Sequence, residues 1–231
     1  MAGILKGRSP LSRRRHKQDG YMNKDIAEIR AALERCFAAQ VSATAEWHEN
    51  EPAEPACSGE SGPEDLLCLV LAQHRWNFLL WHVEDTARRR DVPDSVIADC
   101  KRQVDALNQK RNDCMEKVDQ CLVRLLEPFL PASAEPRRNT ETAGMAVDRL
   151  SILALKIYHM EEQTQRTDAG PEHIRACAGK LDVLRQQRDD LRRAVLELID
   201  DYAAGRKVIA LYSQFKMYND PALNPELYSR R

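Results

Sequence analysis

The sequence has little glycine and lacks the glycine-rich motifs with which many enzymes hold a phosphate group or expose a nucleophile. Nine of the 231 residues are glycine, and no P-loop, Gly-x-Gly-x-x-Gly segment or Gly-x-Ser-x-Gly elbow is present. Folds that cradle phosphate between a strand and a helix need such turns. We therefore expect neither a nucleotide-binding α/β domain nor a serine hydrolase of that kind.

The sequence also lacks net charge and a long apolar run. The formal net charge is -1, so no global field attracts the protein to nucleic acid, which we do not expect as a partner. The longest apolar run, residues 66–72, is too short to span a bilayer, and no secretory apolar region follows Met1. These features predict a cytoplasmic protein with no membrane span. The basic run at 13–17 is interpreted as part of a solvated tail.

Paired Cys-x-x-Cys motifs are absent as well, and the number of cysteines is odd. Most of the seven cysteines fall among apolar neighbours at helical spacing, which indicates buried free thiols rather than a metal site or a disulfide framework. A catalytic cysteine paired with a histidine is a weaker alternative, because the apolar surroundings favour a core position. The seven are Cys36, Cys57, Cys68, Cys100, Cys114, Cys121 and Cys177.

Apolar residues at steps of three and four occupy most of the chain and predict an all-α protein. We expect a disordered basic tail at 1–21, an N-terminal helix at 22–47, an acidic flexible linker at 48–63 and a helical bundle at 64–228. Within the bundle, the tail at 206–228 contains Asn-Pro and Asp-Pro turns and large side chains. It is therefore expected to be ordered and to pack on the helices.

One stretch of the bundle occurs twice. Residues 82–118 align without a gap on residues 159–195, at an offset of 77, with 12 identities in 37 pairs. This similarity predicts duplicated long helical hairpins, at about 64–127 and 141–205. Such hairpins typically form a pseudo-two-fold four-helix bundle, to which the N-terminal helix is an extra element.

The two copies share an arginine in an otherwise apolar heptad seam. Arg111 and Arg188 are equivalent at the offset of 77, and both lie in lines of apolar residues spaced three and four apart. A buried arginine needs a carboxylate partner. We expect Arg111 to contact Glu84 or Asp85, and Arg188 to contact Glu161 or Glu162, from the preceding helix of each hairpin.

Three interpretations of the surrounding polar residues stay open. The first is that they only set the register of the helices. The second is a non-catalytic module that binds an anionic small molecule or a protein partner. Its candidate ligand-binding residues are Asn77, Trp81, His82, Glu84, Asp85, Arg88, Asn108, Arg111, Asn112, Asp113, Arg149, Tyr158, His159, Glu162, Arg188, Lys216 and Asn219.

The third interpretation is a metal-dependent hydrolase acting on a nucleotide or nucleotide sugar. Its metal ligands would be His82, Asp85, Asp113, His159, Glu162 and Asp190. The signal is weak, because known dinuclear helical sites use the order acid-x-x-His and because nearby arginines repel a cation. The sequence assigns no cofactor and leaves the oligomeric state open.

Four separated motifs resemble a bacterial domain-of-unknown-function family, number 4254. They are NFLLWHVEDTAR at 77–88, LNQKRND at 107–113, DRLSILALKIYHM at 148–160 and FKMYNDP at 215–221. The resemblance covers about residues 23–228 and implies a cytoplasmic, all-helical protein, sometimes considered alongside cell-surface glycan genes. It implies no activity and no functional residues.

Overall fold

Helices are the only regular secondary structure in the described part of the chain, and turns and extended segments connect them. The computed structural model describes residues 10–57, 62–133, 137–215 and 220–228, and for residues 10–25 it describes only the helical backbone. No described helix has both the length and the apolar character needed to cross a membrane. The all-α prediction is confirmed. The helices are α1 (Pro10–Glu49), α2 (Pro63–Ala87), α3 (Asp94–Leu126), the 3-10 turn η1 (Glu127–Phe129), α4 (Ala143–Thr164), α5 (Pro171–Ala203) and α6 (Pro225–Tyr228).

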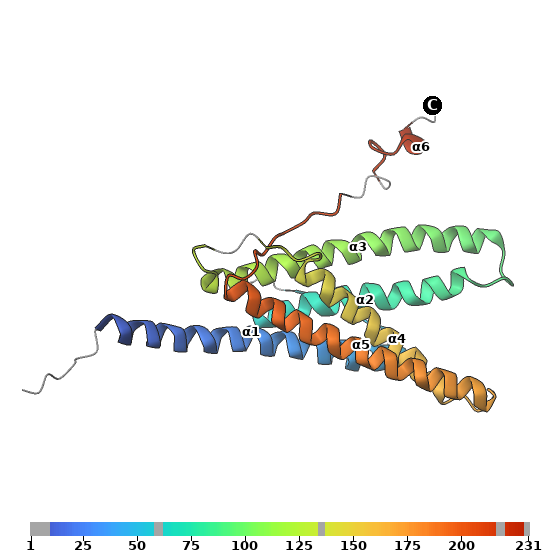
Figure 1. The fold of residues 1–231 in the computed structure, drawn as a ribbon. Coiled ribbons are helices and arrows are strands. Elements are labelled where there is room, and N and C mark those ends of the chain that lie inside the picture. The colour runs from blue at the N-terminus through green and yellow to red at the C-terminus, as the bar shows by residue number, and fades with distance from the viewer. Residues whose placement is uncertain (1–9, 58–61, 134–136, 216–219, 229–231) are drawn as a thin grey trace, which may run out of the picture.

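Two antiparallel hairpins, α2 with α3 and α4 with α5, make up most of the molecule and diverge toward their turns (Figure 1). Helices α3 and α5 each contain 33 residues and begin 77 positions apart. The two turns also match, since Arg89 pairs with Asp91 and Arg166 pairs with Asp168 in the same two-bond arrangement. These features agree with the predicted offset, while the duplication itself stays a prediction.

Helix α1 is a central part of the core rather than an extra element. Leu33, Cys36 and Phe37 are fully buried among side chains of α2, α3, α4 and α5. The helix begins at Pro10, upstream of the start near residue 22 that the sequence predicts, and proline is favourable at a first helical position. Because its apolar stripe covers both hairpins, α1 can bring polar side chains to the centre of the bundle.

Helices α3 and α4 approach closely at Gly144. A Cβ atom there would lie 2.7 Å from the carbonyl oxygen of Met115 and 2.8 Å from Cγ of Asp119. The space is instead used by a hydrogen bond of 2.6 Å from the backbone N–H of Gly144 to Oδ1 of Asp119. Burial raises the pKa of Asp119 to about 6. This close crossing sets how near α4 lies to the polar face of α3.

Two of the seven cysteines form a disulfide, so the prediction that all are free thiols is wrong. Cys57 is bonded to Cys68, whereas the other five are free and buried. The spacing of eleven residues matches no common motif, and only the fold brings the segment before α2 back against it. Arg75 of α2 holds the same segment by donating from Nε to the carbonyl oxygen of Pro52 at 2.9 Å. Disulfides are rare in the reducing cytoplasm, so this bond does not support the predicted cytoplasmic location.

We expect the Cys57–Cys68 disulfide to contribute about 2–3 kcal/mol to the free energy of unfolding, because it closes a short loop in the unfolded chain. Urea unfolding with and without reductant measures the contribution. The Cys57→Ser variant should have the lower stability under both conditions. If reductant lowers the stability of the Cys57→Ser variant as much as that of the wild type, a bond other than Cys57–Cys68 causes the effect of reduction.

The prediction that the tail packs on the bundle is wrong for its described end. Hydrogen bonds from Val208 to the carbonyl oxygen of Arg137 and from Gln214 to Glu116 hold the first part of the tail. Beyond it, Phe215 is 88% exposed and Tyr228 is 54% exposed. The described end, with α6, leads away from the bundle (Figure 1). Within the described tail, Ile209 packs against the core, whereas the large side chains further along stay exposed.

Candidate functional site

A chain of hydrogen bonds crosses the interior from α4 through α2 to α1. Asn77 donates from Nδ2 to Oγ of Ser151 at 2.8 Å, and Ser151 lies 2.7 Å from Nδ1 of His74. On the other side of the ring, Nε2 of His74 lies 3.0 Å from Oγ1 of Thr44, which donates to the carbonyl oxygen of Gln40 at 2.8 Å. The hydroxyl of Ser151 can accept from Asn77 and donate to His74. The hydroxyl of Thr44 can accept from His74 and donate to the carbonyl oxygen of Gln40.

The histidine of this chain is neutral and sealed from solvent. Burial lowers the pKa of His74 to about 3. Both His74 and Ser151 are completely buried. A serine beside a histidine resembles a nucleophile with its base, but no substrate can reach this pair. We conclude that the His74–Ser151 contact is structural.

Asp148 is the acceptor at the centre of a second polar group. Its Oδ1 accepts hydrogen bonds from Gln73 and, at 2.9 Å, from Nδ2 of Asn77. Nε of Arg111 lies 3.3 Å from the same oxygen, forming an ion pair in which the Asp148 side chain is only 5% exposed. Burial raises the pKa of Asp148, and the positive charge of Arg111 opposes that shift.

The partners predicted for the two seam arginines are wrong. Arg111 pairs with Asp148 of α4, not with Glu84 or Asp85 of α2, because α4 crosses α3 closely at Gly144 and places Asp148 one turn further along. The seam position predicts that both guanidinium groups are at least partly buried, and the side chains of Arg111 and Arg188 are both partly buried.

Arg188 donates from Nη2 to the carbonyl oxygen of Phe37 at 2.9 Å instead of pairing with Glu161 or Glu162. Glu161 is paired with Arg185, one turn earlier on α5. The reason is that α1 packs against α5 at this point and supplies the acceptor.

An open cleft with a volume of about 330 Å³ lies beside Arg111. Apart from the apolar side chains of Leu80, Ile152 and Leu155, its lining is polar or aromatic. Seven of the predicted binding residues line it, from α2 and α3: Asn77, Trp81, Glu84, Asp85, Arg88, Asn108 and Arg111. The structure thus brings together side chains that are far apart in sequence. We call this feature the α2/α3/α4 cleft.

The cleft carries charges of both signs. Glu84 and Arg88, which both line it, form an ion pair at 3.1 Å in which Arg88 is mostly exposed and Glu84 is half-buried. Deeper in, Nη1 of Arg111 donates to Oδ1 of Asn108 at 3.3 Å. The guanidinium has five N–H donors. Nε lies 3.3 Å from Asp148 without making a hydrogen bond to a described residue, and one Nη1 proton faces Asn108. The remaining donors are available to a group that enters the cleft.

Other predicted residues lie away from this cleft. Asp113 and Asp190 are exposed and accept hydrogen bonds from Gln109 and Gln186 on their own helices. Arg149 is paired with Glu141 and lines a separate cleft on α4 and α5. Asn112 is buried in α3. Lys216 and Asn219 lie outside the described residues.

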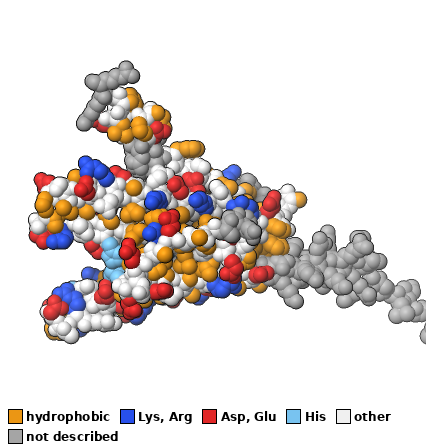
Figure 2. Space-filling model, turned by 180° about the vertical axis from the view of Figure 1, so that it is seen from behind, with side chains coloured by type: hydrophobic (Ala, Val, Ile, Leu, Met, Phe, Trp, Pro, Cys, Tyr) orange, Lys and Arg blue, Asp and Glu red, His pale blue; other side chains and the backbone are white. Residues whose placement is uncertain are grey.

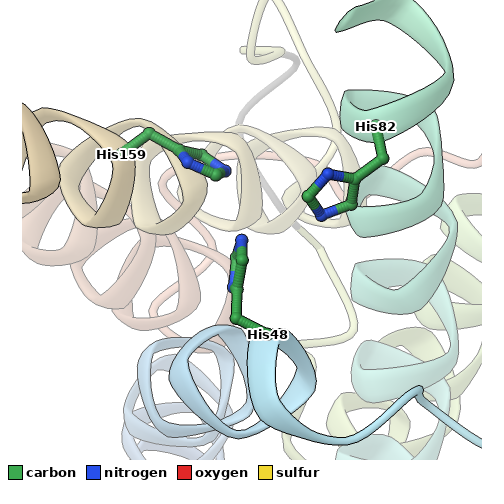
Figure 3. A group of neighbouring side chains, drawn as sticks. All are labelled: His48, His82 and His159. Atoms are coloured by element: carbon green, nitrogen blue, oxygen red, sulfur yellow. The ribbon is translucent and has the colours of Figure 1, made fainter. Parts of the chain in front are cut away.

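A cluster of three imidazoles lies where α1, α2 and α4 meet. Figure 3 shows His48, His82 and His159 pointing toward one another from these three helices, and one ring nitrogen of each lies within 4.8 Å of the others. Histidine side chains are visible in Figure 2 in the notch between the two diverging arms. We call His48, His82 and His159 the imidazole cluster.

Aromatic rings fix the cluster on two sides. Tyr158 stacks on His48 with ring centroids 4.1 Å apart, and Trp81 stacks on His159 at 4.7 Å with an interplanar angle of 8°. Burial, followed by the neighbouring His48 and His159, lowers the pKa of His82. Trp81 also lines the α2/α3/α4 cleft, so the two sites share a side chain.

Sequence reasoning missed four residues of these sites: His48, His74, Asp148 and Ser151. A signal existed for His74 and Ser151, which are 77 positions apart and would pair if the repeat alignment were extended upstream. His48 lies outside the repeat and next to the acidic segment, so no pattern connects it with His82 and His159.

The family described as "Protein of unknown function (DUF4254)" matches residues 68–211, more than half of the chain. The chain belongs to the DUF4254 family. The matched part of this DUF4254 protein runs from α2 to beyond α5, so it includes the α2/α3/α4 cleft and two of the three imidazoles and leaves out α1. No curated protein and no solved structure matches the chain.

Proposed function

We propose that this DUF4254 protein is a non-catalytic binding protein that holds an anionic small molecule in the α2/α3/α4 cleft. The observation that carries the proposal is the position of Arg111 at the wall of this cleft, with its guanidinium fixed by Asp148 and Asn108 and with unused N–H donors. A planar guanidinium binds a carboxylate or phosphate through two parallel hydrogen bonds.

The rest of the cleft suits a ligand that has a ring or an apolar part beside its anionic group. Trp81 offers an indole already oriented by its stacking on His159, and Leu80 and Ile152 add apolar surface. A volume of about 330 Å³ lies at the lower end of the range for small-molecule sites. This combination favours a phosphorylated or carboxylated metabolite, with nucleotide sugars at the upper limit of size.

Binding without chemistry is the better-supported interpretation of the cleft. The described residues that line it include no serine, cysteine or histidine, and of its two carboxylates, Glu84 is paired with Arg88. The hydrolase alternative needs Asp113 and Asp190 beside the histidines, and both point away on exposed helix faces. The protein-partner alternative has no comparable cluster of contacts to support it.

We further propose that the site arose from a duplicated hairpin, with α2 and α4 facing each other across a pseudo-two-fold axis. Support comes from contacts between residues 77 positions apart. His74 meets Ser151, and the rings of His82 and His159 have centroids 6.0 Å apart. Equivalent positions meet only close to a symmetry axis, so this relation accounts for polar residues gathering between α2 and α4.

A thermal-shift experiment tests the binding proposal. Inorganic phosphate, pyrophosphate and a nucleotide sugar are added to the full chain with a chelator present, so that metal binding does not contribute. A ligand at 100 times its dissociation constant stabilises the folded state by about 2.7 kcal/mol, which raises the melting temperature of a chain of this size by about 5–10 °C. The Arg111→Met, Asp148→Leu double variant should fold and give no such shift.

The matched control is Arg102→Met, which removes an exposed arginine about two and a half turns earlier on α3 that is paired with Asp99. It should keep the full ligand-induced shift. Equal shifts in the wild type, the control and the double variant would place the anion elsewhere and refute the proposal. The absence of any shift with all three probes would refute it as well.

A further inference from the structure

We propose that His48, His82 and His159 form a binding site for one divalent transition-metal ion of the zinc class. Imidazole nitrogens suit zinc, copper, nickel and iron, and three histidines are a common ligand set for zinc. The proposed metal ligands differ from the residues of the anion site, because none of the three histidines lines the α2/α3/α4 cleft, although Trp81 contacts both sites. Each ligand comes from a different helix, so an ion would link α1, α2 and α4.

In His48 and His159, the hydrogen bonds engage Nδ1 and leave Nε2 available to a metal ion. Nδ1 of His48 lies 2.6 Å from the carbonyl oxygen of Thr44, which can only accept, so Nδ1 carries the proton. Nδ1 of His159 likewise lies 2.7 Å from a carboxylate oxygen of Glu162. In both rings Nε2 is then the unprotonated nitrogen with a lone pair, as a metal ligand must be.

Those two Nε2 atoms are buried and have no hydrogen-bond partner among the described residues. A buried acceptor without a partner destabilises the folded state, and the cluster contains two of them. Packing of aromatic rings alone gives no reason for this arrangement. A single cation between the rings would satisfy both lone pairs.

The spacing of the cluster is close to that of a bound ion. Zinc lies about 2.0–2.1 Å from each imidazole nitrogen, so ligand nitrogens in a tetrahedral site are about 3.3 Å apart. The present nitrogens lie within 4.8 Å of one another. Each ligand nitrogen would move inward by at most about 0.9 Å to reach the spacing of a tetrahedral zinc site, which a small side-chain rotation provides. Three protein ligands leave one position of the tetrahedron for water or another ligand.

The surroundings resemble those of metal-binding histidines. A carboxylate or a backbone carbonyl behind the ligating ring fixes its tautomer and orientation and makes it more basic, and here Glu162 and Thr44 take these two roles. The carboxylate of Glu162 contacts the ring of His159, and its negative charge favours a cation at the cluster. Arg111 is paired with Asp148 in the neighbouring polar group, which weakens the objection that arginines repel a metal here.

Titration with Zn²⁺ and Co²⁺ tests the inference on the full oxidised chain carrying no histidine tag. Calorimetry should give one ion per chain. The Co²⁺ spectrum should show the visible bands of tetrahedral nitrogen ligation without the intense near-ultraviolet band that thiolate ligands produce. Binding to the buried free cysteines would give that band and would overturn the proposal.

Single substitutions identify the ligands. His82→Gln and His159→Gln should each weaken Zn²⁺ binding by at least 100-fold, and Glu162→Gln, a positioning residue, by 10–100-fold. The control His173→Gln changes a histidine of α5 outside the cluster and should bind as the wild type does. The variants are first checked for wild-type helicity by circular dichroism. Undiminished binding in His82→Gln and His159→Gln, or no saturable binding by the wild type, would overturn the proposal.

Discussion

Replacing Asp148 by leucine is expected to lower the free energy of unfolding by about 3–5 kcal/mol. The carboxylate is buried and accepts from Gln73 and Asn77 while facing the guanidinium of Arg111. Without it, a largely buried positive charge has no counter-charge, and two buried amide groups lose their acceptor. Urea unfolding followed by circular dichroism measures the loss.

The double variant Asp148→Leu, Arg111→Met separates two contributions to stability: the ion pair with Arg111, and the hydrogen bonds from the amides of Gln73 and Asn77. Removing both members of a buried ion pair is often neutral, whereas removing one leaves an uncompensated charge. We expect the double variant to be less stable than the wild type by about 2 kcal/mol, the cost of the two amides of Gln73 and Asn77. If the single and double variants are equally unstable, Asp148 and Arg111 are not coupled and the description of the polar interior is incorrect.

Gly144→Ala is expected to destabilise the protein by about 2–3 kcal/mol, although alanine is the better helix former by about 1 kcal/mol. The added methyl group would lie 2.7 Å from the backbone carbonyl oxygen of Met115, which cannot move without shifting α3. It would also meet Asp119, whose Oδ1 accepts from the N–H of Gly144. The steric cost therefore exceeds the gain in helix propensity.

Gly179→Ala on α5 is the matched control, because a Cβ atom there meets nothing within 4 Å. This substitution should stabilise the protein by up to about 1 kcal/mol, so the two variants should differ by about 3–4 kcal/mol in their free energies of unfolding. Two variants of equal stability would mean that α3 and α4 do not approach closely at Gly144. The close crossing could then not explain why Asp148 lies beside Arg111.

The helices could be predicted from the sequence because their signals are local. Proline opens α2 and α5, Thr142 caps α4 by accepting from the N–H of Met145 at 3.2 Å, and Gly205 adopts a φ of 70 just after α5. Each signal acts within one turn, and the apolar periodicity between them is strong. These local signals lie at the observed ends of α2, α4 and α5.

The candidate site was predictable only in part, because its contacts join helices that the sequence does not pair. The heptad seam predicts that Arg111 needs a carboxylate partner, but the identity of that partner, Asp148, depends on how α4 crosses α3. His48 enters because α1 packs inside the bundle, which its amphipathic pattern does not reveal. The exposed Phe215 shows the same limit, since a large apolar side chain is buried only where another element offers a groove.

The most direct test of the binding proposal is a titration of the ¹⁵N-labelled protein with pyrophosphate, followed through the arginine Nε–H signals. The signal of Arg111 is identified by its loss in the Arg111→Lys variant. The proposal predicts that this signal shifts progressively and reaches saturation, while that of Arg102 on the exposed face of α3 stays in place. An Arg111 signal that does not move while other arginine signals do would contradict the assignment of the anion to the α2/α3/α4 cleft.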